Sequence, residues 1–186
     1  MEHVPHFYAK DRAEWREWLE AHHVSESAVR LVYDKGPGRK LHWADIVQEA
    51  LCYGWIDSRP GKVSDTQSKL YITQRKPKSV WSKINKGYID GLVASGLMQP
   101  AGQAAIDRAK ENGAWSALNL SDDLVYPAGL ITEFEQHPSA RVNFESFSES
   151  SRRNALQWIY DAKMDTTRDA RIAQIIEAAE QGIRLR

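Results

Sequence analysis

The 186-residue sequence has a single cysteine, Cys52, so it cannot form an internal disulfide bond. Its fold therefore does not depend on an oxidising compartment. No run approaches 18 apolar residues, and the N-terminus has no apolar stretch of the signal-peptide type. We therefore expect a cytoplasmic protein without membrane insertion.

The sequence also lacks an excess of charge of either sign, because 25 Lys and Arg residues balance 25 Asp and Glu residues. A dedicated binder of double-stranded DNA usually carries a basic excess, since neutralising phosphates supplies much of its affinity. The net charge therefore argues against double-stranded DNA as a partner. With 42% hydrophobic and 27% charged residues, the composition is that of an ordinary globular protein.

Motifs of the common nucleotide and hydrolase sites are absent: there is no G-x-G-x-x-G, no G-x-x-x-x-G-K-[ST] and no G-x-S-x-G. No cysteine and histidine spacing is typical of zinc. Cys52 also lacks a histidine in a catalytic pattern, because His42 would lie at the other end of the same helix, about 15 Å away. We therefore predict no cofactor, no metal and no catalytic residue, with Cys52 in a structural role.

The patterns that are present predict an α+β fold. Alternating apolar residues predict strands over 28–33 and 69–76, with a polar loop before the second strand. The pattern D-R-A-E predicts a helix that starts near Asp11, and Ser79 is the expected N-cap of a later helix. An apolar stripe predicts a helix over 42–55. Its cysteine lies nearly opposite the stripe, so either a second layer covers the thiol or it is partly exposed.

Two parts of the chain are predicted. Residues 1–118 form an α+β domain, with a small antiparallel sheet packed with helices, and this domain carries the candidate site. Residues 126–186 form an all-helical C-terminal subdomain, because their apolar residues recur at helical spacing. The segment NLSDDLVYPAG between them is the best candidate for a linker. It is short and poor in glycine, so we expect the C-terminal subdomain to pack on the first domain.

Positive charge is concentrated between Arg59 and Lys86, where eight basic residues accompany one acidic residue, Asp65. Such a run is often only a solvated surface. Two features favour a binding site instead. RKPKSVWS places three cations just before a predicted helix N-terminus, where backbone N–H groups favour an anion. Aromatic residues are also interleaved with the cations: Trp55, Tyr71 and Trp81.

We therefore predict a site for an anionic small molecule or for an anionic group of a protein partner. In this site, cations pair with the ligand, hydroxyl and amide groups donate hydrogen bonds, and tryptophans form apolar walls. A carboxylate orients a cation or accepts a hydrogen bond from the ligand. The predicted ligand-binding residues are Trp55, Asp57, Arg75, Lys76, Ser79, Trp81, Ser82 and Asn85.

Four blocks of the sequence resemble the YdeI/OmpD-associated family, also called bacteriocin-protection proteins. In chain order they are EALCYGWIDS, YITQRKPKSVWSKINK, GLMQPAG and RRNALQWIYDAKMDTTRDARI. The resemblance runs over nearly the whole chain, although the family more often has glycine where Ser58 stands. It implies a cytoplasmic bacterial α+β protein with a helical C-terminal region and a role in protection against bacteriocins or antimicrobial peptides. It implies no catalytic residue.

The preferred interpretation is a non-catalytic stress or bacteriocin-protection protein that binds an anionic ligand at the basic and aromatic site. One alternative is an enzyme that acts on a phosphorylated or carboxylated metabolite, with Asp57 as the general base. Another alternative is the binding of single-stranded nucleic acid through the interleaved aromatic and basic residues. The sequence leaves both alternatives open.

Overall fold

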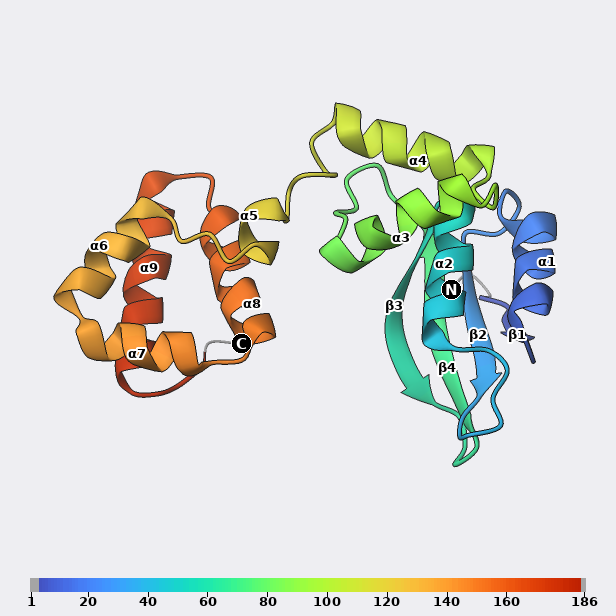
Figure 1. The fold of residues 1–186 in the computed structure, drawn as a ribbon, viewed down its shortest axis with the longest axis horizontal. Helices are drawn as coiled ribbons and strands as arrows, with labels where there is room; N and C mark the ends of the chain where they lie inside the picture. The colour runs from blue at the N-terminus through green and yellow to red at the C-terminus, as the bar shows by residue number, and fades with distance from the viewer. Residues whose placement is uncertain (1–3, 185–186) are drawn as a thin grey trace. The chain divides into compact units, whose positions relative to one another are not determined.

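The computed structural model describes residues 4–184 of the chain, which form two compact units (Figure 1). The N-terminal unit ends at Ser116 and the C-terminal unit begins at Ala117. Each unit has its own hydrophobic core. The predicted α+β class is confirmed, because the sheet lies in the N-terminal unit and the C-terminal unit is helical. The predicted packing of the C-terminal part on the N-terminal part stays a prediction.

In the described part of the N-terminal unit, four strands form one sheet that packs with four helices. The strands are β1 (His6–Tyr8), β2 (Ala28–Asp34), β3 (Trp55–Lys62) and β4 (Gln67–Gln74). The helices are α1 (Arg12–His22), α2 (Trp43–Cys52), α3 (Lys83–Ala94) and α4 (Pro100–Glu111). The strand order is β1-β2-β4-β3, with β4 antiparallel to both neighbours and β1 parallel to β2. The sheet is therefore mixed, because β1 adds a parallel pair to the predicted antiparallel arrangement.

The two predicted strands are confirmed as β2 and β4. Their alternation holds in the structure, since Leu31, Leu70 and Ile72 are buried in the core. β3 is a strand where the sequence predicted a polar loop, and that prediction was wrong. Its sequence, WIDSRPGK, has few residues that favour strands, and proline is tolerated at a sheet edge. Pairing with β4 stabilises it, with a bulge between Asp57 and Pro60.

Capping side chains mark the starts of α1 and α3. Asp11 is the N-cap of α1, as predicted, and its carboxylate accepts a hydrogen bond from the backbone N–H of Glu14 at 3.1 Å. The prediction of Ser79 as an N-cap was wrong. α3 begins later, after Ser82, whose hydroxyl accepts from the N–H of Asn85 at 3.3 Å. The chain before it forms turns that bury the Trp81 ring, and burial of this large ring outweighs an earlier helix start.

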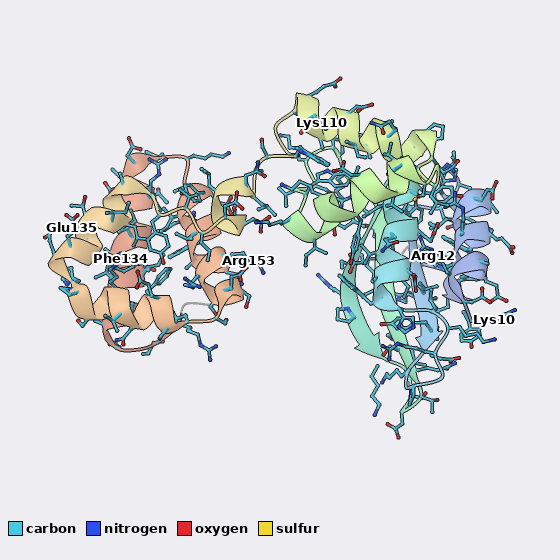
Figure 2. The ribbon with its side chains drawn as sticks, in the orientation of Figure 1. Lys10, Arg12, Lys110, Phe134, Glu135 and Arg153 are labelled. Atoms are coloured by element: carbon cyan, nitrogen blue, oxygen red, sulfur yellow. The ribbon has the colours of Figure 1, made fainter. Side chains whose placement is uncertain are left out.

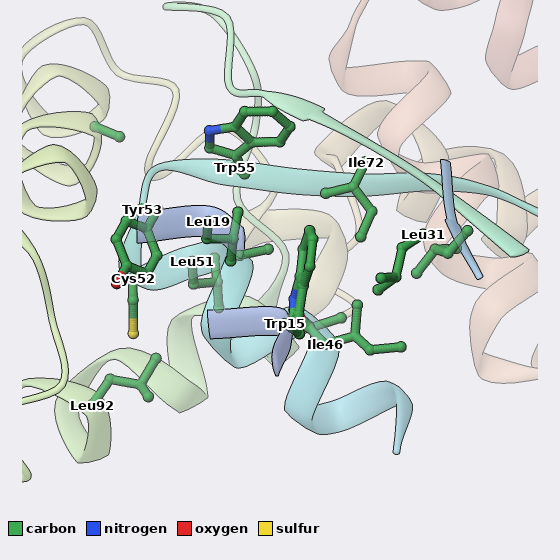
Figure 3. Close-up of a cluster of buried hydrophobic side chains, with 14 of the residues drawn as sticks. Trp15, Leu19, Leu31, Ile46, Leu51, Cys52, Tyr53, Trp55, Ile72 and Leu92 are labelled. Atoms are coloured by element: carbon green, nitrogen blue, oxygen red, sulfur yellow. The ribbon is translucent and has the colours of Figure 1, made fainter. Parts of the chain in front are cut away.

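The core of the N-terminal unit lies between the sheet and α2, with α1 beside α2 (Figure 1). Figure 3 shows Trp15 and Ile46 facing the sheet residues Leu31 and Ile72. Trp15 also donates a hydrogen bond from its indole N–H to the carbonyl of Ile46, at 3.1 Å. The fully buried tryptophan therefore fixes α1 against α2 by both packing and a polar contact.

A second layer of helices covers the thiol of Cys52, which is one of the two predicted outcomes. Cys52 is fully buried, and Figure 3 shows its sulfur directed toward Leu92 of α3. α4 approaches the same end of α2 so closely that a Cβ on Gly102 would lie 2.3 Å from the carbonyl oxygen of Cys52. Glycine at this position is therefore required by the close helix contact.

The C-terminal unit is a small helical bundle. Its helices are α5 (Asn119–Asp122), α6 (Ala128–Gln136), α7 (Pro138–Ser146), α8 (Glu149–Tyr160) and α9 (Asp165–Glu180). Figure 2 shows Phe134 pointing into this unit, where it packs with the buried ring of Phe144, whereas Glu135 points outward. The predicted linker segment begins with α5, which belongs to this unit because Ser121 donates a hydrogen bond to the Gln157 side chain at 2.7 Å. Among the described residues, no helix has the length and apolar character needed to span a bilayer.

Candidate anion-binding groove

A groove of about 1060 Å³ lies on the face of the sheet where β4 presents Lys69, Tyr71 and Thr73. These residues alternate with the buried core residues Leu70 and Ile72, so they point to the other side of the sheet. The strands β2 and β3 and the chain just after β4 complete the lining. The groove is therefore formed by the side of the sheet opposite to the core.

The groove is basic. Its lining includes five cationic residues: Arg30, Arg59, Lys69, Arg75 and Lys76. No Asp, Glu or His is among the described residues that line it. Within residues 4–184, none of the five cations forms an ion pair with a carboxylate. Neighbouring cations without carboxylates create a positive potential that attracts anions.

Strand register brings together residues that are distant in the sequence. Arg30 of β2 pairs with Tyr71 of β4, and the Arg30 guanidinium carbon lies 5.9 Å from the centre of the Tyr71 ring. The next outward pair is Val32 with Lys69. Ser58 of β3 lies on the other side of β4 and donates a hydrogen bond to the carbonyl of Tyr71 at 3.1 Å. Tyr71 is therefore at the centre of the groove, next to a guanidinium group.

Arg75 is the buried cation of the groove, with only 6% of its surface exposed. Its guanidinium stacks on Trp81 at 3.7 Å from the ring centre, and Nη1 donates to the carbonyl of Val80 at 3.2 Å. Nε and Nη2 have no hydrogen-bond partner within the described part of the chain. Burial lowers the pKa of Arg75 to about 10, while the charge of Asp57 acts in the opposite direction. Arg75 is therefore protonated at neutral pH and has two unused donors.

The structure places the other predicted site residues in different surroundings. Lys76 lines the groove next to Arg75. Trp81 is buried beneath Arg75, so it supports the cation and does not form an exposed wall. Trp55 is also buried, and its indole N–H donates to the carbonyl of His23 at 3.3 Å. The two tryptophans thus belong to the framework of the unit.

Three of the predicted polar residues are used locally. The hydroxyl of Ser79 accepts from the N–H of Lys76 at 3.1 Å, and that of Ser82 caps α3. Asn85 is buried in the first turn of α3. None of these three is among the groove-lining residues. Together with Arg75 and Trp81 they form the support of the groove's end, and their role in ligand binding stays a prediction.

Asp57 is turned away from the groove. The register pairs it with Ile72, whose side chain faces the core, and its Oδ2 accepts from the indole N–H of Trp43 at 3.3 Å. Asp57 therefore connects β3 with the start of α2. Its electrostatic effect on Arg75 acts from the helix-covered side of the sheet.

Arg30 is not among the site residues predicted from the sequence because it lies outside the basic run of residues 59–86. A signal was available in the alternation of β2, where Arg30 stands between the buried residues Val29 and Leu31. This alternation predicts that Arg30 points away from the core, yet it does not reveal which strand pairs with β2. The proximity of Arg30 to Tyr71 therefore required the structure.

Catalytic and metal sites are not suggested by the remaining reactive side chains. Burial raises the pKa of the Cys52 thiol to about 11, and the nearby charge of Glu49 adds to this effect. The thiolate that a nucleophile requires is therefore scarce at neutral pH. In residues 4–184, no group of three or more His, Cys, Asp or Glu side chains is arranged to hold a metal ion.

Two family models match the chain, one in each unit. Residues 7–105 match the family described as Domain of unknown function (DUF8412), and residues 123–182 match Bacteriocin-protection, YdeI or OmpD-Associated. Searches of curated proteins and of solved structures gave no match. The blocks EALCYGWIDS and YITQRKPKSVWSKINK lie in the N-terminal match, whereas RRNALQWIYDAKMDTTRDARI lies in the C-terminal match. The chain thus belongs to the DUF8412 family, whose model covers just over half of it, and its C-terminal unit matches the YdeI/OmpD-associated, bacteriocin-protection family over residues 123–182.

Proposed function

We propose that this bacteriocin-protection-type protein is a non-catalytic binding protein whose basic groove holds an anionic ligand. The observation that carries the proposal is the set of five groove cations without an ion-pair partner among the described residues. Like charges held close together repel one another and lower the stability of the free protein. An anion in the groove would remove this repulsion.

Arg75 gives the groove a fixed donor in addition to its diffuse charge. Nε and Nη2 are covered by protein atoms and have no partner among the described residues, which costs about 1–3 kcal/mol, so a shift of the covering atoms that lets an anion reach them favours the bound state. The planar guanidinium offers two parallel N–H groups, a geometry that matches a phosphate or a carboxylate. The Trp81 ring holds this guanidinium in place. Relative to the site predicted from the sequence, the proposed site keeps Arg75 and Lys76 and adds the residues of the open sheet face.

The lining of the groove favours binding over catalysis. General acid–base catalysis usually relies on His, Glu or Asp within hydrogen-bond reach of the substrate. Neither a carboxylate nor an imidazole lies among the described lining residues, and Asp57 points to the other side of the sheet. The enzyme alternative therefore gains no support from the groove.

Calorimetric titration of the whole chain with inorganic polyphosphate at low ionic strength tests the proposal. The double variant Arg30→Gln/Lys69→Gln should bind at least about tenfold more weakly, because it removes two charges that the groove directs at the ligand. Lys62→Gln is the matched control. Lys62 belongs to the same basic run, but it pairs with Asp65 and lies opposite Ser68, on the other face of β3.

The control should keep the affinity of the natural sequence. The proposal is contradicted if the natural sequence does not bind polyphosphate, or if the double variant and the control lose affinity equally. In the second case the positive run acts as a general surface charge and the groove has no special role.

A further inference from the structure

The basic groove is longer than a single anionic group. Lys69, Tyr71 and Thr73 face it at every second position of β4, and Arg75 continues the same row at the end of the strand. Six residues of extended chain advance about 20 Å. Lys69 and Arg75 therefore act at separate points along the groove, and an extended polyanion contacts both ends at once.

The middle of the groove carries an aromatic ring. Tyr71 lies between Lys69 of β4 and Arg75, which follows the strand, and Arg30 stands across from it on β2. An aromatic ring on a flat sheet face stacks with nucleobases, and each stacked base adds affinity without requiring a particular sequence. A polyanion without bases would gain nothing from this ring. Tyr71 thus indicates that the ligand has flat, apolar groups between its charges.

The hydroxyl groups beside the ring fit the same ligand. Thr73 and Ser58 line the groove on either side of Tyr71. The Thr73 hydroxyl can donate or accept a hydrogen bond at the edge of a base that stacks on the ring, and the Ser58 hydroxyl, which donates to the Tyr71 carbonyl, can accept one. At the end of the row, the guanidinium of Arg75, held on the Trp81 ring, adds a fixed positive charge that attracts a phosphate.

We propose that the groove binds a single strand of nucleic acid, with its phosphates on the groove cations and a base stacked on Tyr71. This inference rests on the proposed anion-binding function and names the class of ligand. A duplex is a poorer fit because its bases are stacked on one another and closed to Tyr71. Recognition of a duplex groove also requires an inserted helix or β-ribbon, whereas this site is an open sheet face.

Fluorescence anisotropy with a labelled oligothymidine of about twelve nucleotides tests the inference on the whole chain. Unlabelled hairpin duplex and polyphosphate of equal charge serve as competitors. Both should compete at least about tenfold less well than unlabelled oligothymidine, because neither offers free bases. The logarithm of the affinity should fall with the logarithm of the salt concentration, by about 0.7 for each phosphate contacted. Lys69→Gln should reduce that slope by about this amount.

Variants of Tyr71 separate stacking from charge. Tyr71→Leu should weaken oligothymidine binding about tenfold, whereas Tyr71→Phe should retain it, since stacking needs the ring and not the hydroxyl. Both variants should bind polyphosphate as the natural sequence does. Leucine is apolar and common in strands at partly buried positions, and circular dichroism verifies that both variants fold.

The outcomes distinguish the inference from the proposed function. If polyphosphate or duplex competes as well as oligothymidine, or if Tyr71→Leu has no effect, the nucleic-acid inference is overturned while the groove remains an anion site. If neither polyphosphate nor oligothymidine binds, both proposals fail. Selective loss of oligothymidine binding in Tyr71→Leu supports the single-strand inference alone.

Discussion

The N-terminal unit uses its basic side chains differently on its helix-covered side and on its groove side. Between α1 and α2, Arg12 and Arg16 each contact the buried carboxylate of Glu49 at 2.6 Å. On the groove side, Arg30 and Lys69 have no carboxylate partner in the described part of the chain. An ion pair connects two elements of the fold. Neighbouring charges without partners repel one another and lower stability, so we expect them where a ligand neutralises them. The helix side thus uses its charges within the fold, whereas the proposed binding surface leaves its charges without carboxylate partners in the described part of the chain.

The largest effect that this comparison predicts is on the helix side. Glu49→Ala removes the shared carboxylate, which leaves Arg12 with Asp45 alone and Arg16 without a carboxylate partner among the described residues, so the free energy of unfolding should fall by about 3 kcal/mol. Urea denaturation measures this change. The exposed Glu17 of α1 provides the control, because its replacement by Ala should change stability by less than about 0.5 kcal/mol. Equal losses in both variants would remove the special role of the buried carboxylate.

Two glycine substitutions test how closely α4 packs against α2. Gly102→Ala should cost about 2 kcal/mol, although alanine favours helices, because the new Cβ would meet the carbonyl oxygens of Leu51 and Cys52. Gly91→Ala in α3 meets nothing within 4 Å and should stabilise the protein by about 0.5–1 kcal/mol. Thermal unfolding of the two variants gives opposite shifts if the contact is as close as the structure shows. Shifts of the same sign would contradict it.

Ser82 is the N-cap of α3 and lies outside the groove lining. Ser82→Ala removes the hydroxyl that accepts from Asn85 N–H, and it should lower the free energy of unfolding by about 1 kcal/mol. Ser82→Asp retains an N-cap acceptor and should keep the stability. Because the hydroxyl is used in the cap, polyphosphate affinity should change little in Ser82→Ala at a temperature where it is folded. A loss of affinity without a loss of stability would indicate that the Ser82 hydroxyl contacts the ligand.

The pH dependence of the free energy of unfolding tests whether the thiol of Cys52 is buried. Its pKa is about 11 in the folded protein and about 9 in the unfolded chain, so the unfolded chain loses its proton first as the pH rises. The thiol's contribution to stability is therefore full below pH 9 and is lost between pH 9 and about 11, with about 1 kcal/mol lost by pH 10. Cys52→Ala should lack this decrease. Urea denaturation of both proteins from pH 8 to 10 measures the difference, and parallel pH profiles would show that the thiol is not covered.

The smallest expected effect on stability is on the groove side. Lys69→Gln should change the free energy of unfolding by less than about 0.5 kcal/mol, because Lys69 forms no ion pair within residues 4–184. Salt titration of its thermal unfolding checks the same point, since relief of repulsion in the variant should make its melting temperature less dependent on salt. A large loss of stability would mean that Lys69 has a structural role like that of Arg12.

Local sequence patterns determined much of the N-terminal unit. The alternation in β2 and β4 assigned Leu31, Leu70 and Ile72 to the core, and the carboxylate of Asp11 marked the start of α1. These features depend on side-chain period and on capping, which act between near neighbours in the chain. The basic run of residues 59–86 was also visible without a structure.

Only the tertiary structure decided which of these residues form the groove. β3 has a sequence that is unfavourable for a strand, and it forms because β4 supplies its hydrogen bonds. Trp55 and Trp81 were expected as apolar walls of the ligand site, yet both are buried, since packing of their large rings in the core stabilises the unit more than solvent exposure. Arg30 meets Tyr71 across 41 positions of sequence through the register of β2 and β4. Register is fixed by burial of whole strand faces, so no local pattern shows which partner a residue meets.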